Sequence, residues 1–264
     1  MTTSQHFDSQ GVAIAYFDTG ANVITGDAEG KPPVLLIHGF ASNAQTNWVG
    51  PSWVLTLKGA GYRVIALDNR GHGNSAKLYN LEDYSAPVMA EDAKRLLDHL
   101  GIAKAHVIGY SMGARISAFL TLAHPDRIGK AVFGGMGYNM VRGMAGTGPI
   151  AHALEADSLE NVTNPTARTF RLFAEQTKSD LKALAACIRS SRAPLTPEMV
   201  ARITNPVLVA VGEQDVIAGS PGELASLIKG AQAFTIPNRD HMKAVGDKAF
   251  KDAVLKFFGE PRDA

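Results

Sequence analysis

The stretch Ala105-His106-Val107-Ile108-Gly109-Tyr110-Ser111-Met112-Gly113 decides the fold of this chain. It opens as an apolar run of strand character, and a helix-forming run, Ala114–Ala123, follows it. A serine between two glycines at this spacing, G-x-S-x-G, is typical of a sharp and strained strand-to-helix turn, where side chains at the glycine positions would collide with the strand or the helix. The turn exposes the serine Oγ, and the next backbone N–H, that of Met112, points toward the same space. Ser111 is therefore a candidate nucleophile.

The rest of the chain alternates between short apolar runs and segments of helical periodicity. The apolar runs that we interpret as strands are Val34–Ile37, Tyr62–Leu67, Ala105–Gly109, Lys130–Phe133, Val207–Val211 and Ala233–Ile236. The clearest helical patterns are Tyr84–Leu100, Met112–Ala123 and Phe250–Phe258. Alternation of this kind predicts an α/β fold with a mostly parallel sheet covered by helices on both faces. Near the start, His6–Ser9 and Val12–Phe17 flank Gln10-Gly11, which predicts an antiparallel hairpin at the edge of the sheet.

One region breaks the alternation, because residues 137–205 contain no convincing strand. Gly143–Gly148 is predicted to be a loop, and Pro165–Thr177 and Ser179–Ser190 are predicted to be helices. These helices are either an extra layer packed on the core or a mobile cap over a pocket. We favour the cap, because an insertion of this size between two strands commonly shapes a site. The expected division is a core of residues 1–136 and 206–264 with a helical cap of residues 137–205.

Several motifs together resemble the α/β-hydrolase fold family, and the resemblance runs nearly end to end. They are His38-Gly39-Phe40 after a strand, the turn Asp68-Asn69-Arg70-Gly71-His72-Gly73-Asn74-Ser75, Ala123-His124-Pro125, the strand and loop Val209–Asp215, and Asp240-His241. The order Ser, Asp, His is also that of the family. The resemblance implies the α/β-hydrolase fold with an eight-stranded sheet.

The resemblance also implies a catalytic triad and an oxyanion hole. Ser111 would be the nucleophile, His241 the base and Asp215 the acid, with Asp68 as the main competitor for the acid and Glu213 as a neighbour. Asp68 is expected instead to stabilise its own turn. His38 is expected to hold its loop by hydrogen bonds. The backbone N–H groups of Phe40 and Met112 would form the oxyanion hole.

The substrate pocket is less constrained by sequence. Phe170 and Phe173 lie three residues apart on a predicted helix and project in similar directions. Tyr138 and Met242 follow a strand or a triad residue, and the Phe40 ring either lines the pocket or packs in the core. Each aromatic side chain could equally be buried without touching substrate. We expect Tyr138, Phe170, Phe173 and Met242 to line the pocket.

The identity of the nucleophile narrows the reaction that the resemblance implies. Haloalkane dehalogenases and epoxide hydrolases of this family carry Asp where this chain has Ser111. C–C hydrolases commonly carry Asn before the serine and Trp after the histidine, where this chain has Tyr110 and Met242. We expect hydrolysis of a carboxylic ester or lactone through an acyl-enzyme. A C–C hydrolase, a thioesterase, a perhydrolase and a non-catalytic hydrolase-fold receptor remain alternatives.

Composition sets limits on partners and location. The 264 residues include 26 Lys and Arg against 25 Asp and Glu, so the net charge of +1 gives no reason to expect nucleic acid or an anionic membrane as a partner. The polar start MTTSQHFDSQ lacks the pattern of a secretory signal, and Cys187 is the single cysteine, so we expect a cytoplasmic protein, with a periplasmic one as the alternative. No metal or cofactor is expected, and the pattern indicates no particular oligomeric state.

Overall fold

The computed structural model describes residues 4–20, 30–143, 147–190 and 195–260. Eight strands form one sheet in the order β1-β2-β4-β3-β5-β6-β7-β8. Strand β1 pairs with β2, and β2 with β4, in antiparallel fashion, whereas the other neighbours are parallel. The strands are β1 Gln5–Asp8, β2 Ala13–Asp18, β3 Val34–Ile37, β4 Val64–Leu67, β5 Ala105–Tyr110, β6 Ile128–Gly134, β7 Val207–Gly212 and β8 Gln232–Ile236.

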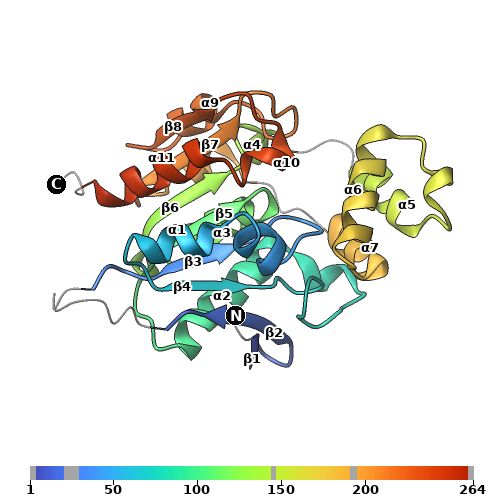
Figure 1. The fold of residues 1–264 in the computed structure, drawn as a ribbon, viewed down its shortest axis with the longest axis horizontal. Helices are drawn as coiled ribbons and strands as arrows, with labels where there is room; N and C mark the ends of the chain where they lie inside the picture. Colours follow the sequence, from blue (N-terminus) through green and yellow to red (C-terminus); the bar gives the residue numbers. More distant parts are fainter. Residues whose placement is uncertain (1–3, 21–29, 144–146, 191–194, 261–264) are drawn as a thin grey trace.

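Helices cover both faces of this sheet (Figure 1). The core helices are α1 Trp53–Gly59, α2 Ala86–His99, α3 Met112–Ala123, α9 Pro221–Ser226, α10 His241–Ala244 and α11 Lys248–Gly259. The helices between β6 and β7 are α4 Asn139–Arg142, α5 Thr147–Glu155, α6 Pro165–Gln176, α7 Leu181–Arg189 and α8 Pro197–Val200. Short helical turns lie at Gln45–Val49, Leu81–Tyr84, Pro125–Arg127 and Leu159–Asn161.

The core consists of two apolar layers, because alternate residues of each strand point to opposite faces of the sheet. In β3, Leu35 and Ile37 join the layer under α2 and α3, and Val34 and Leu36 join the layer under α1 and α11. All four side chains are fully buried. A strand with no polar position is what a parallel sheet covered on both faces requires.

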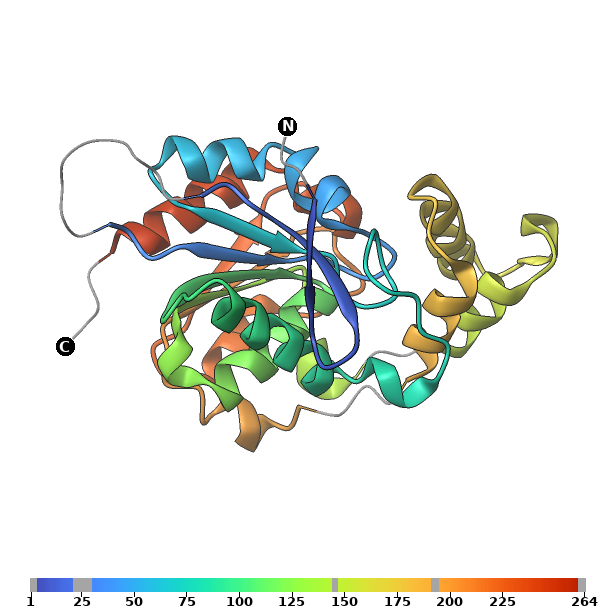
Figure 2. The same ribbon diagram turned by 90° about the horizontal axis from the view of Figure 1, so that it is seen from below.

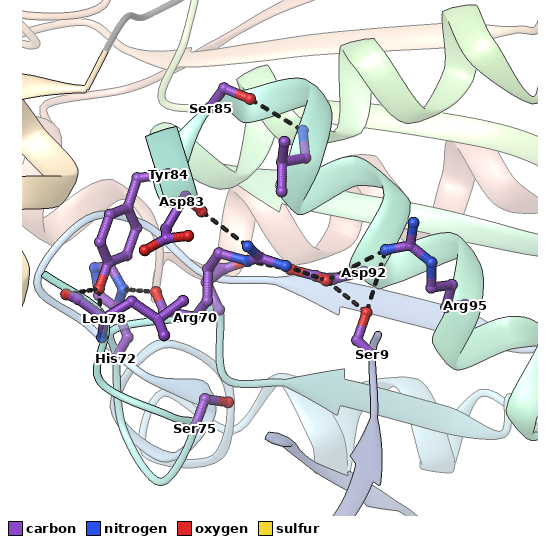
Figure 3. A network of polar contacts seen from close by, with 12 residues as sticks. Ser9, Arg70, His72, Ser75, Leu78, Asp83, Tyr84, Ser85, Asp92 and Arg95 are labelled. Carbon is purple, nitrogen blue, oxygen red and sulfur yellow. Dashed lines mark hydrogen bonds and ion pairs between the residues drawn. The ribbon is translucent and has the colours of Figure 1, made fainter. Parts of the chain in front are cut away.

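A buried ion pair ties the turn after β4 to a helix and to the N-terminal hairpin (Figure 3). Arg70 donates from Nε and Nη2 to the two carboxylate oxygens of Asp92 on α2, each at 2.7 Å. Ser9, which follows β1, donates to the same carboxylate at 2.6 Å, and Arg95 lies 3.7 Å from it. A bidentate pair with further hydrogen bonds satisfies charges that would otherwise be costly to bury. The network fixes the turn that leads into Ser75.

The segment between β6 and β7 forms a group of helices beside the sheet. Helices α5, α6 and α7 lie together to the right of the sheet in Figure 1, and they remain apart from it in the turned view of Figure 2. Helix α5 packs against both α6 and α7. In this segment, the residues that the structure describes contain no strand.

The structure confirms the predicted α/β-hydrolase architecture, including the edge hairpin, where Gln10 and Gly11 both have positive φ. The prediction of a loop over Gly143–Gly148 is wrong in part, because α5 begins at Thr147. Proline in the first turn of a helix loses no hydrogen bond, so Pro149 does not prevent this start. Residues 144–146 of that predicted loop lie outside the described residues.

Candidate active site

The turn between β5 and α3 places Ser111 above the carboxyl end of the sheet. Ser111 has φ 55° and ψ −114°, a region that non-glycine residues rarely adopt. A Cβ added at Gly109 would lie 2.2 Å from the Gly113 carbonyl oxygen, and one added at Gly113 would lie 1.9 Å from that of Ile37. The two glycines are therefore required by close backbone approach, as the sequence pattern predicts.

The structure brings three of the predicted residues into one hydrogen-bonded series. The Nε2 atom of His241 lies 3.0 Å from the Oγ of Ser111, and its Nδ1 lies 2.7 Å from the Oδ2 of Asp215. The other carboxylate oxygen of Asp215 accepts hydrogen bonds from the backbone N–H groups of Ile217 and Ala218, at 2.8 and 3.0 Å. The carboxylate is fully buried, and these bonds fix its direction toward the imidazole.

The loops that carry the acid and the histidine are held to each other. The backbone N–H of Gln214 donates to the carbonyl oxygen of Arg239 at 2.9 Å. Asp240 caps α10, because its Oδ1 accepts from the N–H groups of Met242 and Lys243 at 3.1 and 2.9 Å. His241 is thus the first residue of a capped helix, and its ring is held by the hydrogen bond to Asp215.

Residues 38–44, here called the oxyanion loop after the role that was predicted for Phe40, follow β3 and pass beside Ser111. Burial lowers the pKa of His38 to about 4, so its ring is neutral. Its Nδ1 donates to the carbonyl oxygen of Gly39 at 2.7 Å, and its Nε2 accepts from the N–H of Asn69 at 2.9 Å. The N–H of Gly39 donates to the Oδ1 of Asn47 at 3.1 Å. His38 therefore holds the loop by hydrogen bonds, as expected.

The backbone N–H groups of Phe40 and Met112 are the predicted oxyanion donors. Within the described residues, neither donates a hydrogen bond to a protein acceptor. Met112 is the first residue of α3, where the unsatisfied N–H groups of the helix favour negative charge. Both donors are therefore free to bind a ligand oxygen.

Asp68, the competitor for the acid, lies in a different environment. Its Oδ1 accepts from the N–H of Ala44 and its Oδ2 from the N–H of Asn74, each at 2.8 Å. Both carboxylate oxygens are thus engaged by the backbone of the loops on either side. This geometry gives Asp68 the structural part that was expected of it, and the carboxylate beside His241 is that of Asp215.

A cavity of about 120 Å³ opens beside Ser111 and His241. Phe170 and Phe173 of α6 and Met242, which were predicted to line the pocket, line this cavity. The ring of Phe40, for which pocket and core were both open, lines it and also belongs to the apolar core. Tyr138 is not among the lining residues. The remaining lining residues are Gly39, Ser42, Thr46, Asn47, Tyr110 and Val245.

Three features near this site were not predicted from the sequence. They are the contacts of Asn47 and Thr177 with the oxyanion loop, and the hydrogen bond from the Tyr110 hydroxyl group to the carbonyl oxygen of His241. Asn47 lies in a π-helical turn, Gln45–Val49. Such turns are rare in proteins overall, but those that occur are often found at functional sites. Thr177 lies 136 positions from its partner Ala41 in the oxyanion loop. No periodic or spaced pattern relates residues so distant in sequence. The π-helical turn likewise has no sequence signature that we could have used.

No helix in the part of the chain that the structure describes is both long and apolar enough to span a membrane. The described residues also contain no group of three or more His, Cys, Asp or Glu side chains placed to hold a metal ion.

Comparison with known proteins agrees with this architecture. A sequence model of the alpha/beta hydrolase fold family matches residues 32–143, which include Ser111 and the oxyanion loop but not Asp215 or His241. The 2-hydroxy-6-oxononadienedioate/2-hydroxy-6-oxononatrienedioate hydrolase of Escherichia coli is 41% identical over 110 residues, which are 41% of this chain and 38% of that protein. The matched segments span about a quarter to two fifths of the curated relatives.

Solved structures match over nearly the whole chain. A hydrolase from Pseudomonas aeruginosa PA01 has a TM-score of 0.75 and 27% identity, with 98% of this chain and 99% of that one covered. The enol-lactonase from Burkholderia xenovorans LB400 has a TM-score of 0.75 and 22% identity, with 97% and 100% covered. The chain has the α/β-hydrolase fold, and hydrolases are among the proteins to which it is similar.

Proposed function

We propose that this chain is a serine hydrolase that cleaves a carboxylic ester or lactone through an acyl-enzyme. The observation that carries the proposal is the series Ser111–His241–Asp215, with heavy-atom distances of 3.0 and 2.7 Å, at the wall of a cavity. A strained serine, a base within hydrogen-bond reach and a buried carboxylate behind that base are the arrangement that activates a hydroxyl group.

The proposed reaction follows from the directions of these groups. His241 Nε2 accepts the proton of Ser111 as Oγ bonds to the carbonyl carbon, and the carbonyl electron pair moves to oxygen. The N–H groups of Phe40 and Met112 bind that oxyanion. The tetrahedral intermediate then expels the alcohol oxygen, which takes the proton from Nε2. A water molecule then attacks the acyl-enzyme carbonyl carbon while His241 Nε2 accepts its proton. The second tetrahedral intermediate expels Ser111 Oγ, which takes the proton from Nε2, and the acid is released.

The division of the chain into two parts belongs to this proposal. Residues 1–136 and 206–264 form the catalytic core, and residues 137–205 form a helical cap. Two cap residues, Phe170 and Phe173, share a cavity with Ser111, which supports a cap that shapes the acyl pocket. Met242 lines the same cavity and is retained as a pocket residue, whereas Tyr138 is not.

A C–C hydrolase is the second candidate, favoured by the 41% identity to the Escherichia coli hydrolase over 110 residues. Its reaction would use the same serine and histidine on a carbon–carbon bond next to a ketone. The residues beside the nucleophile and base, Tyr110 and Met242, argue against this candidate, because C–C hydrolases commonly carry Asn and Trp at these positions.

Turnover of a substrate panel tests the proposal. Purified protein is assayed with esters of graded acyl length, lactones, thioesters and a ring-fission dienoate, before and after treatment with EDTA. We expect ester or lactone turnover with rapid regeneration of free enzyme, unchanged by the chelator. Turnover of the dienoate alone would favour the C–C hydrolase, and binding without any turnover would favour a receptor.

A further inference from the structure

We propose that Thr177, at the end of cap helix α6, is a positioning residue for the oxyanion hole. Its hydroxyl group fixes the oxyanion loop from the cap side and so holds the N–H of Phe40 where the oxyanion forms. This inference rests on the proposed serine hydrolase function. It assigns to the cap a part in the chemical step, beyond shaping the pocket.

The geometry begins at Ala41, the residue that follows the proposed donor Phe40. Ala41 is fully buried and has φ 59°, in the left-handed region that favours glycine. An alanine there is strained and persists only where surrounding contacts hold it. The Oγ1 of Thr177 lies 2.9 Å from the carbonyl oxygen of Ala41. The contact therefore acts on the strained residue itself.

The proton of Thr177 has more than one possible acceptor. The carbonyl oxygens of Phe173 and Ala174 each lie 3.1 Å from Oγ1, farther than that of Ala41. Ser179 Oγ lies 2.9 Å away and can donate to Thr177. With Ser179 as the donor to Oγ1, the single proton of Thr177 is available for Ala41. The carbonyl oxygens of Phe173 and Ala174 already accept from the N–H groups of Thr177 and Ser179, at 3.0 and 2.9 Å.

Thr177 complements contacts that hold the same loop from the core. Asn47 accepts from the N–H of Gly39, and Asp68 accepts from the N–H of Ala44, on either side of Ala41. Among the described residues, the bond from Thr177 to Ala41 is the only hydrogen bond between the insertion and the oxyanion loop. The middle of the loop is thus fixed by the cap and its two ends by the core.

The same helix also contacts the cavity. Phe173 lines it and lies one turn before Thr177, whose N–H donates to the Phe173 carbonyl oxygen at 3.0 Å. The Phe170 ring lies 6.0 Å from that of Phe40. The position of α6 therefore determines both the position of the pocket wall and that of the oxyanion loop.

The test compares Thr177→Val, which keeps the shape but removes the hydroxyl, with Thr177→Ser, which keeps the hydroxyl. The readouts are kcat and KM for an ester, and the affinity by calorimetry for a trifluoromethyl ketone. Ser111 Oγ adds to the ketone carbon, its proton passes to His241, and the ketone oxygen becomes an oxyanion in the same hole. Ketone affinity thus reports the oxyanion hole even if no ester is turned over.

A matched control separates positioning of the loop from a loosened cap. Tyr79→Phe removes another hydrogen bond between core and cap, from Tyr79 to the Asp180 carboxylate at 2.9 Å, which does not touch the oxyanion loop. We expect Thr177→Val to lower kcat and ketone affinity by about 10- to 100-fold with little change in KM. The Phe40 N–H would be misplaced but still present, so the loss should be smaller than the loss caused by removing an oxyanion donor altogether. Thr177→Ser should restore both, and Tyr79→Phe should change neither.

Other outcomes overturn the inference. Equal losses in Thr177→Val and Tyr79→Phe, a change confined to KM or melting temperature, or wild-type ketone affinity in Thr177→Val would each show that Thr177 does not position the oxyanion hole. Ketone binding that depends on Thr177 without any ester or lactone turnover would count against the proposed substrate class alone. A wild-type protein that binds no ketone would overturn both proposals.

Discussion

The hydroxyl group of Tyr110 donates a hydrogen bond of 2.6 Å to the main-chain carbonyl oxygen of His241. The residue before the proposed nucleophile thereby holds the backbone of the proposed base, 131 positions later in the sequence. Burial, with the nearby carboxylates of Asp215 and Asp240, raises the pKa of Tyr110 well above its ordinary value. The hydroxyl therefore stays a donor over the whole working pH range.

Tyr110→Phe should lower kcat without abolishing it. Removal of the donor leaves the buried carbonyl oxygen of His241 unsatisfied, at a cost of about 1–3 kcal/mol, and lets the histidine backbone shift. Steady-state kinetics should show a loss of similar size at every pH, because the group does not titrate in that range. Tyr16→Phe, which removes a tyrosine hydrogen bond to Gln5 on the edge hairpin, is the control. Equal effects of the two variants on kcat would contradict the positional role of Tyr110.

Asp215→Asn and Asp68→Asn should have opposite consequences. The first removes the carboxylate behind His241 and should lower kcat by about 10⁴-fold, because the imidazole loses control of its tautomer. The second replaces a carboxylate that accepts two backbone N–H groups, and should lower the melting temperature more than kcat. Thermal melts beside steady-state kinetics decide the matter. The reverse pattern would mean that the two roles are exchanged.

The variants Phe170→Ala and Phe173→Ala test whether these two side chains line the acyl pocket or serve only in core packing. Both side chains are half-buried and line the cavity with Ser111. We expect each variant to shift the preferred acyl length, with about 1–3 kcal/mol of discrimination between chains. A purely structural residue would instead lose about 3–5 kcal/mol of stability and keep its acyl preference. Acyl-length profiles and denaturant melts on both variants are the measurements, and an unaltered profile in both would remove these residues from the pocket.

The sequence predicts the fold and the members of the site for a physical reason. Short apolar runs indicate strands of a sheet covered by helices, and each predicted triad residue follows such a run in chain order. Parallel strands bring their carboxyl ends to one edge, so motifs that are distant in sequence meet there. His38 and Asp68 also follow such runs, and it is the resemblance to the family that implies the structural part of Asp68.

Contacts between side chains and distant backbone could not be predicted in this way. The hydrogen bonds from Thr177 to Ala41 and from Tyr110 to His241 depend on how the helices and loops pack against one another, which a periodic sequence pattern does not predict. Tyr138 illustrates the converse error. It follows a strand as the site residues do, but it does not line the cavity.

Acid should destabilise the fold between about pH 6.5 and 4. Burial lowers the pKa of His38 to about 4 and that of His72 to about 3, the latter helped by the neighbouring His38. Unfolded histidine titrates near 6.5, so in this window the unfolded chain binds more protons than the folded one. Stability is therefore fully present above pH 6.5 and falls as the pH is lowered toward the folded pKa values.

Denaturant melts from pH 7.5 to 4 measure this slope. His72→Asn should flatten it, because one of the two buried rings that take up a proton on unfolding is removed. His6→Asn, an exposed histidine of β1, is the control and should leave the slope unchanged. A wild-type stability that is constant over this range would show that the two rings are not held neutral by burial.

The central claim is that Ser111 is a nucleophile activated by His241. A fluorophosphonate reacts with an activated serine by forming an oxygen–phosphorus bond and losing fluoride, and peptide mass spectrometry then locates the adduct. We predict a single adduct at Ser111 in the wild type, none in a folded Ser111→Ala variant, and a rate at least about 100-fold lower in His241→Ala, since the base that takes the proton is gone. Labelling at another serine, or an adduct rate at Ser111 that does not depend on His241, would contradict the claim.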